Sequence, residues 1–293
     1  MARQHRFTMA KIFLFPGQGS QSLGMGKDLF SRFRDQVAVA DEILGYSVED
    51  LCLEGPEDKL NLTPYTQPAL YVVNALTWRQ KLEDGGETPA FTAGHSLGEY
   101  NALLAAGVFD FATGLRLVRE RGRLMGEASG GGMAAVVGLD RNKIESVLRE
   151  NGLESLDIAN LNAPDQTVLS GPKDDIERAK PAFEAAGARM FVPLKVSAAF
   201  HSRYMTPAAE SFARFLEGFT FSPPRIPVIA NVSAKPYGDN DAPANLAGQI
   251  NGPVRWTESI NFLLAQAPDA EFEETGPGKV LAGLLRKIKA GRK

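Results

Sequence analysis

Apolar residues in this chain follow two patterns, short continuous runs and longer stretches with helical spacing. The run at 11–15 ends at Pro16-Gly17, which predicts a buried strand followed by a turn. Runs and helical stretches alternate as far as residue 128, and this alternation predicts a parallel sheet with helices on both faces. The predicted elements are a strand at 11–15, a helix at 22–44, a helix at 67–82 with Thr66 as its N-cap and Pro68 at an early position, a strand around Phe91, a helix ending at Ala105 and a helix at 111–128.

A second pattern begins at the glycine run of residues 129–132. Strands and helices then follow in the order β-α-β-β-α-β, which is typical of a ferredoxin-like unit. We therefore predict a small ferredoxin-like domain at 129–197, inserted into a larger α/β domain formed by 1–128 and 198–293. The predicted elements after residue 132 are strands at 133–138, 157–161, 166–170, 189–196 and 228–230 and helices at 141–151, 174–186 and 206–218, followed by loop and helix.

Composition narrows the class of protein. The 293 residues are 44% hydrophobic and 23% charged, which is typical of a globular protein with a sizeable core. The net charge of −3 argues against nucleic-acid binding across the whole surface. No apolar run reaches the roughly 18–20 residues that span a bilayer, so we predict no membrane partner.

The cysteine content bears on the compartment. Cys52 is the only cysteine, so no intrachain disulfide can form, which fits a reducing setting. Residues 1–9 contain no continuous apolar segment of the signal-peptide kind, and we interpret them as a loose leader. We therefore expect a cytoplasmic protein, and we expect it to be a monomer.

Candidate chemistry centres on residues 94–100, which read GHSLGEY and lie between an apolar run and a helical pattern. G-x-S-x-G between a strand and a helix is typical of a nucleophile elbow, in which small neighbours allow a strained serine at a sharp corner. The sequence thus suggests that Ser96 is a nucleophile, and a tight turn that merely contains a serine is the alternative.

A serine hydroxyl needs a base, and the chain has three histidines. His5 lies in the predicted leader, and His95 adjoins Ser96, so its side chain should point elsewhere. This leaves His201, at the junction where the inserted segment rejoins the larger domain. No obvious acid completes a triad, and a carbonyl oxygen is the alternative group to orient the imidazole.

A second glycine-rich corner, FPGQGSQ at 15–21, follows the first predicted strand. Parallel strands end at the same edge of a sheet, so this loop can direct a backbone N–H toward the same oxyanion as the N–H of Leu97. A simple polar turn is the alternative interpretation.

Together these pieces resemble malonyl-CoA:acyl-carrier-protein transacylases and the acyltransferase domains of polyketide synthases. The matching segments are FPGQGSQ (15–21), GHSLGEY (94–100), LVRERGRLM (117–125), GGGMAAV (130–136), ANLNAP (159–164), FHS (200–202), QINGPVRW (249–256) and GPGKVL (276–281). The resemblance implies an α/β-hydrolase-like large domain with a ferredoxin-like small domain. It also implies Ser96 as nucleophile, His201 as base, and the N–H groups of Gln18 and Leu97 as oxyanion hole.

Two further roles are implied by the resemblance. Arg121 matches the arginine that binds the free carboxylate of the malonyl group, and a guanidinium suits that task because it binds a carboxylate bidentately and stays charged. Gln249 matches a glutamine whose backbone carbonyl orients the histidine.

The resemblance also implies the substrates. The implied donor is malonyl-CoA and the implied acceptor is the phosphopantetheine thiol of an acyl carrier protein, with no metal or redox cofactor. Phe200 should crowd an α-methyl group, which predicts malonyl over methylmalonyl.

Several assignments remain open on the sequence. Residues 101–111 and 200–205 look closer to the free-standing acyltransferases that serve modular polyketide synthases than to the malonyltransferases of fatty acid synthesis. A serine acyl hydrolase would use the same Ser96 and His201, although neutral acyl chains have no use for the charge of Arg121. A noncatalytic docking module would not need these three residues together.

Overall fold

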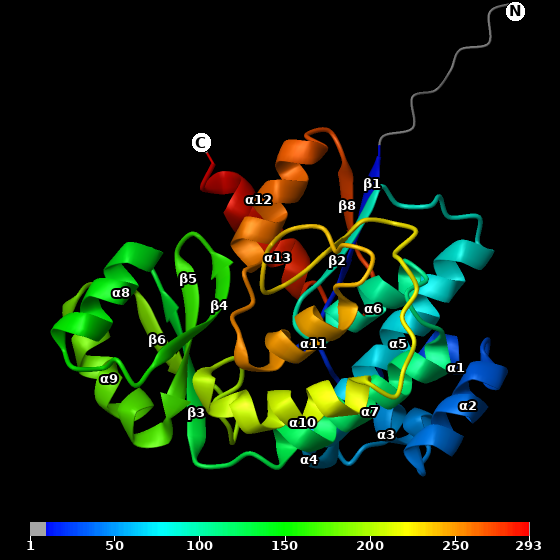
Figure 1. Ribbon diagram of the computed structural model, residues 1–293, viewed down its shortest axis with the longest axis horizontal. Coiled ribbons are helices and arrows are strands. Elements are labelled where there is room, and N and C mark those ends of the chain that lie inside the picture. The colour runs from blue at the N-terminus through cyan, green and yellow to red at the C-terminus, as the bar shows by residue number, and fades with distance from the viewer. Residues whose placement is uncertain (1–9, 293) are drawn as a thin grey trace, which may run out of the picture.

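The computed structural model of the chain describes residues 10–292, so the predicted leader with His5, and Lys293, lie outside the described residues. Figure 1 shows two sheets, each with helices packed on it. The strands are β1 (Lys11–Phe15), β2 (Phe91–Gly94), β3 (Gly131–Val137), β4 (Asp157–Ala163), β5 (Gln166–Pro172), β6 (Met190–Pro193), β7 (Val228–Ile229) and β8 (Glu271–Glu274). The helices are α1 (Lys27–Phe30), α2 (Arg34–Leu44), α3 (Val48–Leu53), α4 (Glu57–Leu60), α5 (Thr63–Glu83), α6 (Gly98–Ala105), α7 (Phe111–Gly126), α8 (Arg141–Glu150), α9 (Lys173–Ala185), α10 (Thr206–Leu216), α11 (Ala242–Asn251), α12 (Trp256–Gln266) and α13 (Val280–Ala290), with a 3₁₀ turn η1 (Arg203–Met205).

The first sheet is parallel, with strand order β7-β2-β1-β8. Side chains alternate between its faces, as the two-residue period of a strand requires. Phe13 and Phe15 pack into a core with α5, α6 and α7, whereas Ile12 and Leu14 pack against α12 and α13. The predicted parallel sheet with helices on both faces is therefore confirmed.

The second sheet is antiparallel, with strand order β4-β5-β3-β6. Its helices α8 and α9 cover one face and share a core with it, and Figure 1 shows this group in green at the left. This is the β-α-β-β-α-β unit predicted from the sequence. β4 also lies against α12 and α13, which joins the two sheets side by side. The predicted domain bounds, 129–197 within 1–128 and 198–293, stay a prediction.

Two predicted helices near the N-terminus differ from the structure. The stretch 22–44 contains two helices, α1 and α2, separated by a turn. α5 begins at Thr63, so Thr66 and Pro68 lie inside it, and the prediction of Thr66 as N-cap is wrong. Pro64 occupies the first turn of α5, where the N–H that proline lacks is not needed. The sequence predicted Pro68 for such an early position.

The strand β8 was not predicted, because its sequence Glu-Phe-Glu-Glu lacks an apolar run. It forms an edge of the parallel sheet, where it pairs with β1. Its one apolar side chain, Phe272, is partly buried against the core that includes α12 and α13. Among residues 10–292 there is no helix whose length and hydropathy would let it cross a bilayer.

Candidate active site

Ser96 lies at the sharp corner between β2 and α6, with its backbone in the left-handed region at φ +50°. The two glycines of the motif are needed for this corner. A Cβ on Gly94 would lie 1.9 Å from the carbonyl carbon of Gly98, and one on Gly98 would lie 2.0 Å from the carbonyl oxygen of Phe15. Asn231 secures the corner, since its Oδ1 accepts from the N–H of Ser96 at 2.7 Å and its Nδ2 donates to the carbonyl of Gly94 at 2.7 Å.

Ser96, His201 and the main chain of Gln249 form a hydrogen-bonded chain. Ser96 Oγ lies 2.8 Å from His201 Nε2, and His201 Nδ1 lies 2.7 Å from the carbonyl oxygen of Gln249. A carbonyl only accepts, so Nδ1 carries the proton and donates it to Gln249. His201 Nε2 is then free to accept the hydroxyl proton of Ser96.

His201 is 5% exposed and its backbone is also left-handed, at φ +57°. Its N–H donates to the carbonyl of Ile250 at 3.2 Å, next to the carbonyl that receives its ring proton. Burial, and then the nearby charge of Arg121, lower the pKa of His201 to about 3. The imidazole is thus neutral in the free protein, as a general base must be.

Arg121 is a fully buried cation beside the nucleophile, with 0% exposure on α7. Its Nη1 donates to Gln67 Oε1 at 2.7 Å, and its Nη2 donates to Gln249 Oε1 at 2.8 Å and to Ser96 Oγ at 3.1 Å. These partners are two amide oxygens and a hydroxyl, and none is a carboxylate. Burial lowers the pKa of Arg121, yet a guanidinium stays protonated, so the site holds a positive charge.

Glu99 is a buried carboxyl that the sequence analysis did not single out. It accepts from the hydroxyl of Tyr237 at 2.6 Å, from the N–H of Asn231 at 3.0 Å and from Nε2 of Gln249. Burial raises the pKa of Glu99 to about 7. Gln249 Nε2 also donates to the carbonyl of Ser96 at 2.8 Å, so Glu99 fixes the amide that contacts both Ser96 and Arg121.

These supporting residues give different signals in the sequence. Glu99 stands inside the quoted motif GHSLGEY, and its position three residues after Ser96 in a buried helix was the available signal. Gln67, Asn231 and Tyr237 belong to no motif, and only the folded chain brings them to the site.

A cavity of about 120 Å³ opens above Ser96. Six of the seven predicted site residues line it, and Gln249 lies behind them, in contact with Arg121 and His201. The six lining residues are Gln18, Ser96, Leu97, Arg121, Phe200 and His201. Other walls come from the antiparallel sheet and the segment after it, through Met133, Asn160, Leu194 and Val196.

The two backbone N–H groups implied as an oxyanion hole belong to Gln18 and Leu97. Both residues line the cavity, and within the described part of the chain neither N–H donates to another group. A Cβ on Gly17 would lie 2.3 Å from the carbonyl oxygen of His95, so glycine brings the Gln18 loop close to the corner. Leu97 precedes the first turn of α6, where the helix dipole favours negative charge.

The remaining described histidine, His95, also borders the cavity but faces away from the hydroxyl. Its Nε2 lies 2.7 Å from Asn162 Oδ1, and its ring meets Trp256 edge-on. Its side chain therefore points elsewhere, as its position next to Ser96 led us to expect. No group of three or more His, Cys, Asp or Glu side chains arranged to hold a metal occurs within residues 10–292.

The comparisons with known proteins all point to the same family. Residues 12–275 match the family described as acyl transferase domain. The polyketide biosynthesis malonyl CoA-acyl carrier protein transacylase PksC of Bacillus subtilis (strain 168) is 56% identical over 278 residues, which cover 94% of this chain and 96% of the relative. The malonyl CoA-acyl carrier protein transacylase of Salmonella typhimurium is 43% identical over 284 residues, which cover 94% of this chain and 92% of the relative.

A solved structure extends the similarity to the fold. The crystal structure of a malonyl CoA-acyl carrier protein transacylase from Burkholderia pseudomallei matches with a TM-score of 0.94 at 53% identity. The match covers 97% of this chain and 99% of that one, so it includes both sheets. The α/β fold with two sheets, predicted from the sequence, is thereby confirmed.

Proposed function

Because the chain belongs to the family of acyl transferase domains, we propose that it transfers a malonyl group from malonyl-CoA to the phosphopantetheine thiol of an acyl carrier protein. The names of its relatives support this substrate and this acceptor. One observation carries the proposal: a fully buried arginine without a carboxylate partner lies 3.1 Å from the hydroxyl that contacts the imidazole. A buried cation of this kind is costly unless an anionic ligand arrives to pair with it.

The first half-reaction uses the hydroxyl of Ser96. His201 Nε2 takes the hydroxyl proton as Ser96 Oγ attacks the thioester carbonyl of malonyl-CoA. The N–H groups of Gln18 and Leu97 stabilise the oxyanion that forms. His201 then returns the proton to the departing sulfur, so CoA leaves as a thiol and a malonyl-serine ester remains.

The second half-reaction runs the same chemistry in reverse order. The carrier thiol gives its proton to His201 and attacks the ester carbonyl, and the oxyanion again occupies the hole. Collapse breaks the bond to Ser96 Oγ, which recovers its proton from His201. Every step is an acyl or proton transfer, so we propose no metal or redox cofactor.

Substrate selection is assigned to Arg121 and Phe200. The Arg121 guanidinium would pair with the free carboxylate of the malonyl group, while Gln67 and Gln249 hold its orientation. Phe200 is buried and lines the cavity, and we propose that its ring favours malonyl over methylmalonyl. Discrimination of one methyl group by packing is worth about 1–3 kcal/mol.

The physiological setting is a finer proposal. We propose that the enzyme serves a polyketide synthase in trans, and the higher identity to the polyketide relative than to the Salmonella enzyme supports this branch. Service to fatty acid synthesis is the alternative. The monomeric state and the cytoplasmic location stay predictions.

Intact mass measurement after mixing the protein with malonyl-CoA alone tests the proposed function. We expect a lasting malonyl adduct, and far less adduct from acetyl-CoA, which has no carboxylate for Arg121. Rapid release of free malonate without an adduct would instead support the serine acyl hydrolase, which uses the same Ser96 and His201.

The pH profile of acylation tests the protonation state of His201. A base whose pKa is lowered, here to about 3, stays unprotonated as the pH falls below the usual value of 6.5. We therefore expect kcat/KM for malonyl-CoA to show no decline near pH 6.5 that belongs to His201.

Glu99, with its pKa raised to about 7, titrates in the same range, so the profile is also measured for Glu99→Gln. A decline near pH 7 that disappears in this variant belongs to Glu99. A decline near pH 6.5 that persists in it would contradict a neutral, buried His201.

A further inference from the structure

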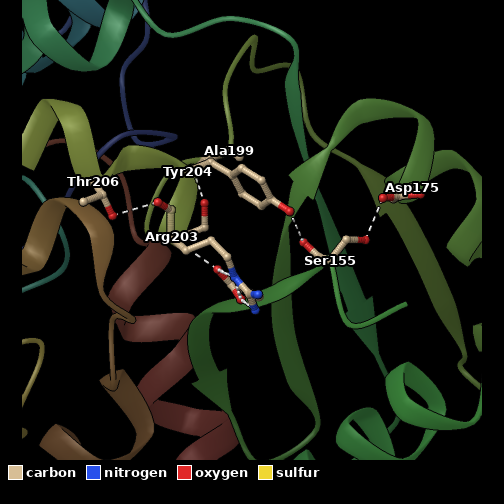
Figure 2. Close-up of polar contacts among 8 residues, drawn as sticks. Ser155, Asp175, Ala199, Arg203, Tyr204 and Thr206 are labelled. Carbon is tan, nitrogen blue, oxygen red and sulfur yellow. Dashed lines mark hydrogen bonds and ion pairs between the residues drawn. The ribbon is translucent and has the colours of Figure 1, made fainter. Parts of the chain in front are cut away.

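The segment that follows His201 contacts the antiparallel sheet through two consecutive side chains. The guanidinium of Arg203 lies on the carboxylate of Asp157, with Nε 2.9 Å from Oδ1. The backbone N–H of Arg203 donates to Asp157 Oδ2 at 2.8 Å. The hydroxyl of Tyr204 donates to the carbonyl of Ser155 at 2.9 Å, and Figure 2 shows this side chain reaching across to Ser155.

These contacts join distant parts of the chain. Asp157 is the first residue of β4, and Ser155 lies two residues before it. Thr206 closes the turn η1, since its Oγ1 donates to the carbonyl of Arg203 at 2.8 Å. The turn that begins two residues after His201 is thereby fixed to the antiparallel sheet.

The other side of His201 is held by α11. Both its N–H and its Nδ1 bond to consecutive carbonyls there, those of Ile250 and Gln249. A histidine at φ +57° adopts a sparsely populated conformation, which persists only where the surroundings fix it from several directions. α11 supplies one set of restraints, and the contact with β4 supplies the other.

We propose that Asp157 and Arg203 are positioning residues for the catalytic base. Their ion pair holds η1 on β4 and so sets where His201 Nε2 lies relative to Ser96 Oγ. The same strand carries Asn160, which lines the cavity. The pair therefore also fixes the position of this cavity wall relative to His201. This inference rests on the proposed function, because it assigns His201 a role in acyl transfer.

The exposure of the pair separates this role from a merely structural one. The Arg203 side chain is 60% exposed and that of Asp157 is 19% exposed. The guanidinium is open to water, which screens the pair and limits its contribution to stability. A small misplacement of a catalytic group, in contrast, lowers the rate steeply. Loss of the pair should therefore reduce turnover while the melting temperature stays nearly unchanged.

The test is acylation kinetics of the purified full chain with Asp157→Asn. We expect kcat for serine acylation to fall about tenfold, with KM for malonyl-CoA within about twofold, because Arg121 is untouched. Acylation by acetyl-CoA should fall by the same factor, since both substrates use His201. The backbone bond to Asp157 remains in Arg203→Lys and in Arg203→Ala, but only lysine keeps a positive charge beside the carboxylate, so Arg203→Lys should be less impaired.

Asp165→Asn is the matched control. Asp165 pairs with Arg189 at 3.0 Å in another ion pair of the same part of the fold, and neither residue belongs to the segment that follows His201. The inference would be overturned if Asp157→Asn and Asp165→Asn had the same kcat. It would also be overturned if the loss of rate in Asp157→Asn came with a large fall in its melting temperature. A wild type that forms no malonyl-enzyme would refute the proposed function itself, before any variant is compared.

Discussion

Ser96→Ala should abolish the malonyl-enzyme while the protein remains folded. The substitution removes the hydroxyl that contacts His201 Nε2, and no acyl ester can then form at this corner. Asn231 accepts from the N–H of residue 96 and Gln249 donates to its carbonyl, and both bonds remain because they involve only the backbone of this residue. Intact mass after incubation with malonyl-CoA gives the result, and circular dichroism checks the fold.

Ser202→Ala is the matched control for this experiment. Ser202 is buried next to His201, but its hydroxyl donates to the carbonyl of Ala199 at 2.5 Å and not to the imidazole. Its alanine variant should still form the adduct. An adduct of equal yield on Ser96→Ala would remove Ser96 from the mechanism.

Arg121→Met should remove the preference for malonyl over acetyl. Without the guanidinium, the malonyl carboxylate enters a buried site unpaired, which costs about 3–5 kcal/mol and corresponds to a loss on the order of 10² to 10⁴ in acylation rate. Acetyl-CoA has no carboxylate, so its acylation should be affected much less. The ratio of kcat/KM for the two substrates measures the change.

Arg123→Met is the control, since Arg123 lies on the same helix but pairs with Glu120 and Glu127 at the surface. We expect its selectivity to equal that of the wild type.

The pH profile of Arg121→Met offers a second readout. Burial, and then the charge of Arg121, lower the pKa of His201, so removal of that charge should raise the pH at which protonation of His201 slows acylation. Unchanged malonyl selectivity would mean that another group binds the carboxylate.

The site residues that the sequence could suggest are those with local patterns. Ser96 stands in a motif whose glycines have a steric reason, because a Cβ on either glycine would lie about 2 Å from a backbone atom. His201 followed from elimination, because only three histidines exist. The resemblance added Arg121, which otherwise reads as part of an exposed basic helix face. The structure buries it completely.

The site residues that the sequence did not predict contact partners that are far away along the chain. Gln67 reaches Arg121 from another helix, and Asn231 reaches Ser96 from the loop after β7. Single amides carry no periodicity, so nothing in their local sequence signals a partner. The strand β8 was not predicted for a related reason, because its sequence has no apolar run. Its acidic residues find partners only in the folded chain, since Glu273 pairs with Lys81 and Glu274 accepts backbone N–H groups at the start of α13.

The acceptor that orients His201 belongs to the main chain of Gln249, and this has a consequence for how the site tolerates substitution. A carboxylate in that place could be lost through a single codon change. A carbonyl oxygen is present whichever residue occupies position 249, provided that α11 keeps its path. The side chain of the same residue contacts Arg121, Glu99 and the carbonyl of Ser96 instead. Changes at this position therefore alter the surroundings of the arginine and one support of the serine corner, while the tautomer of the base stays intact.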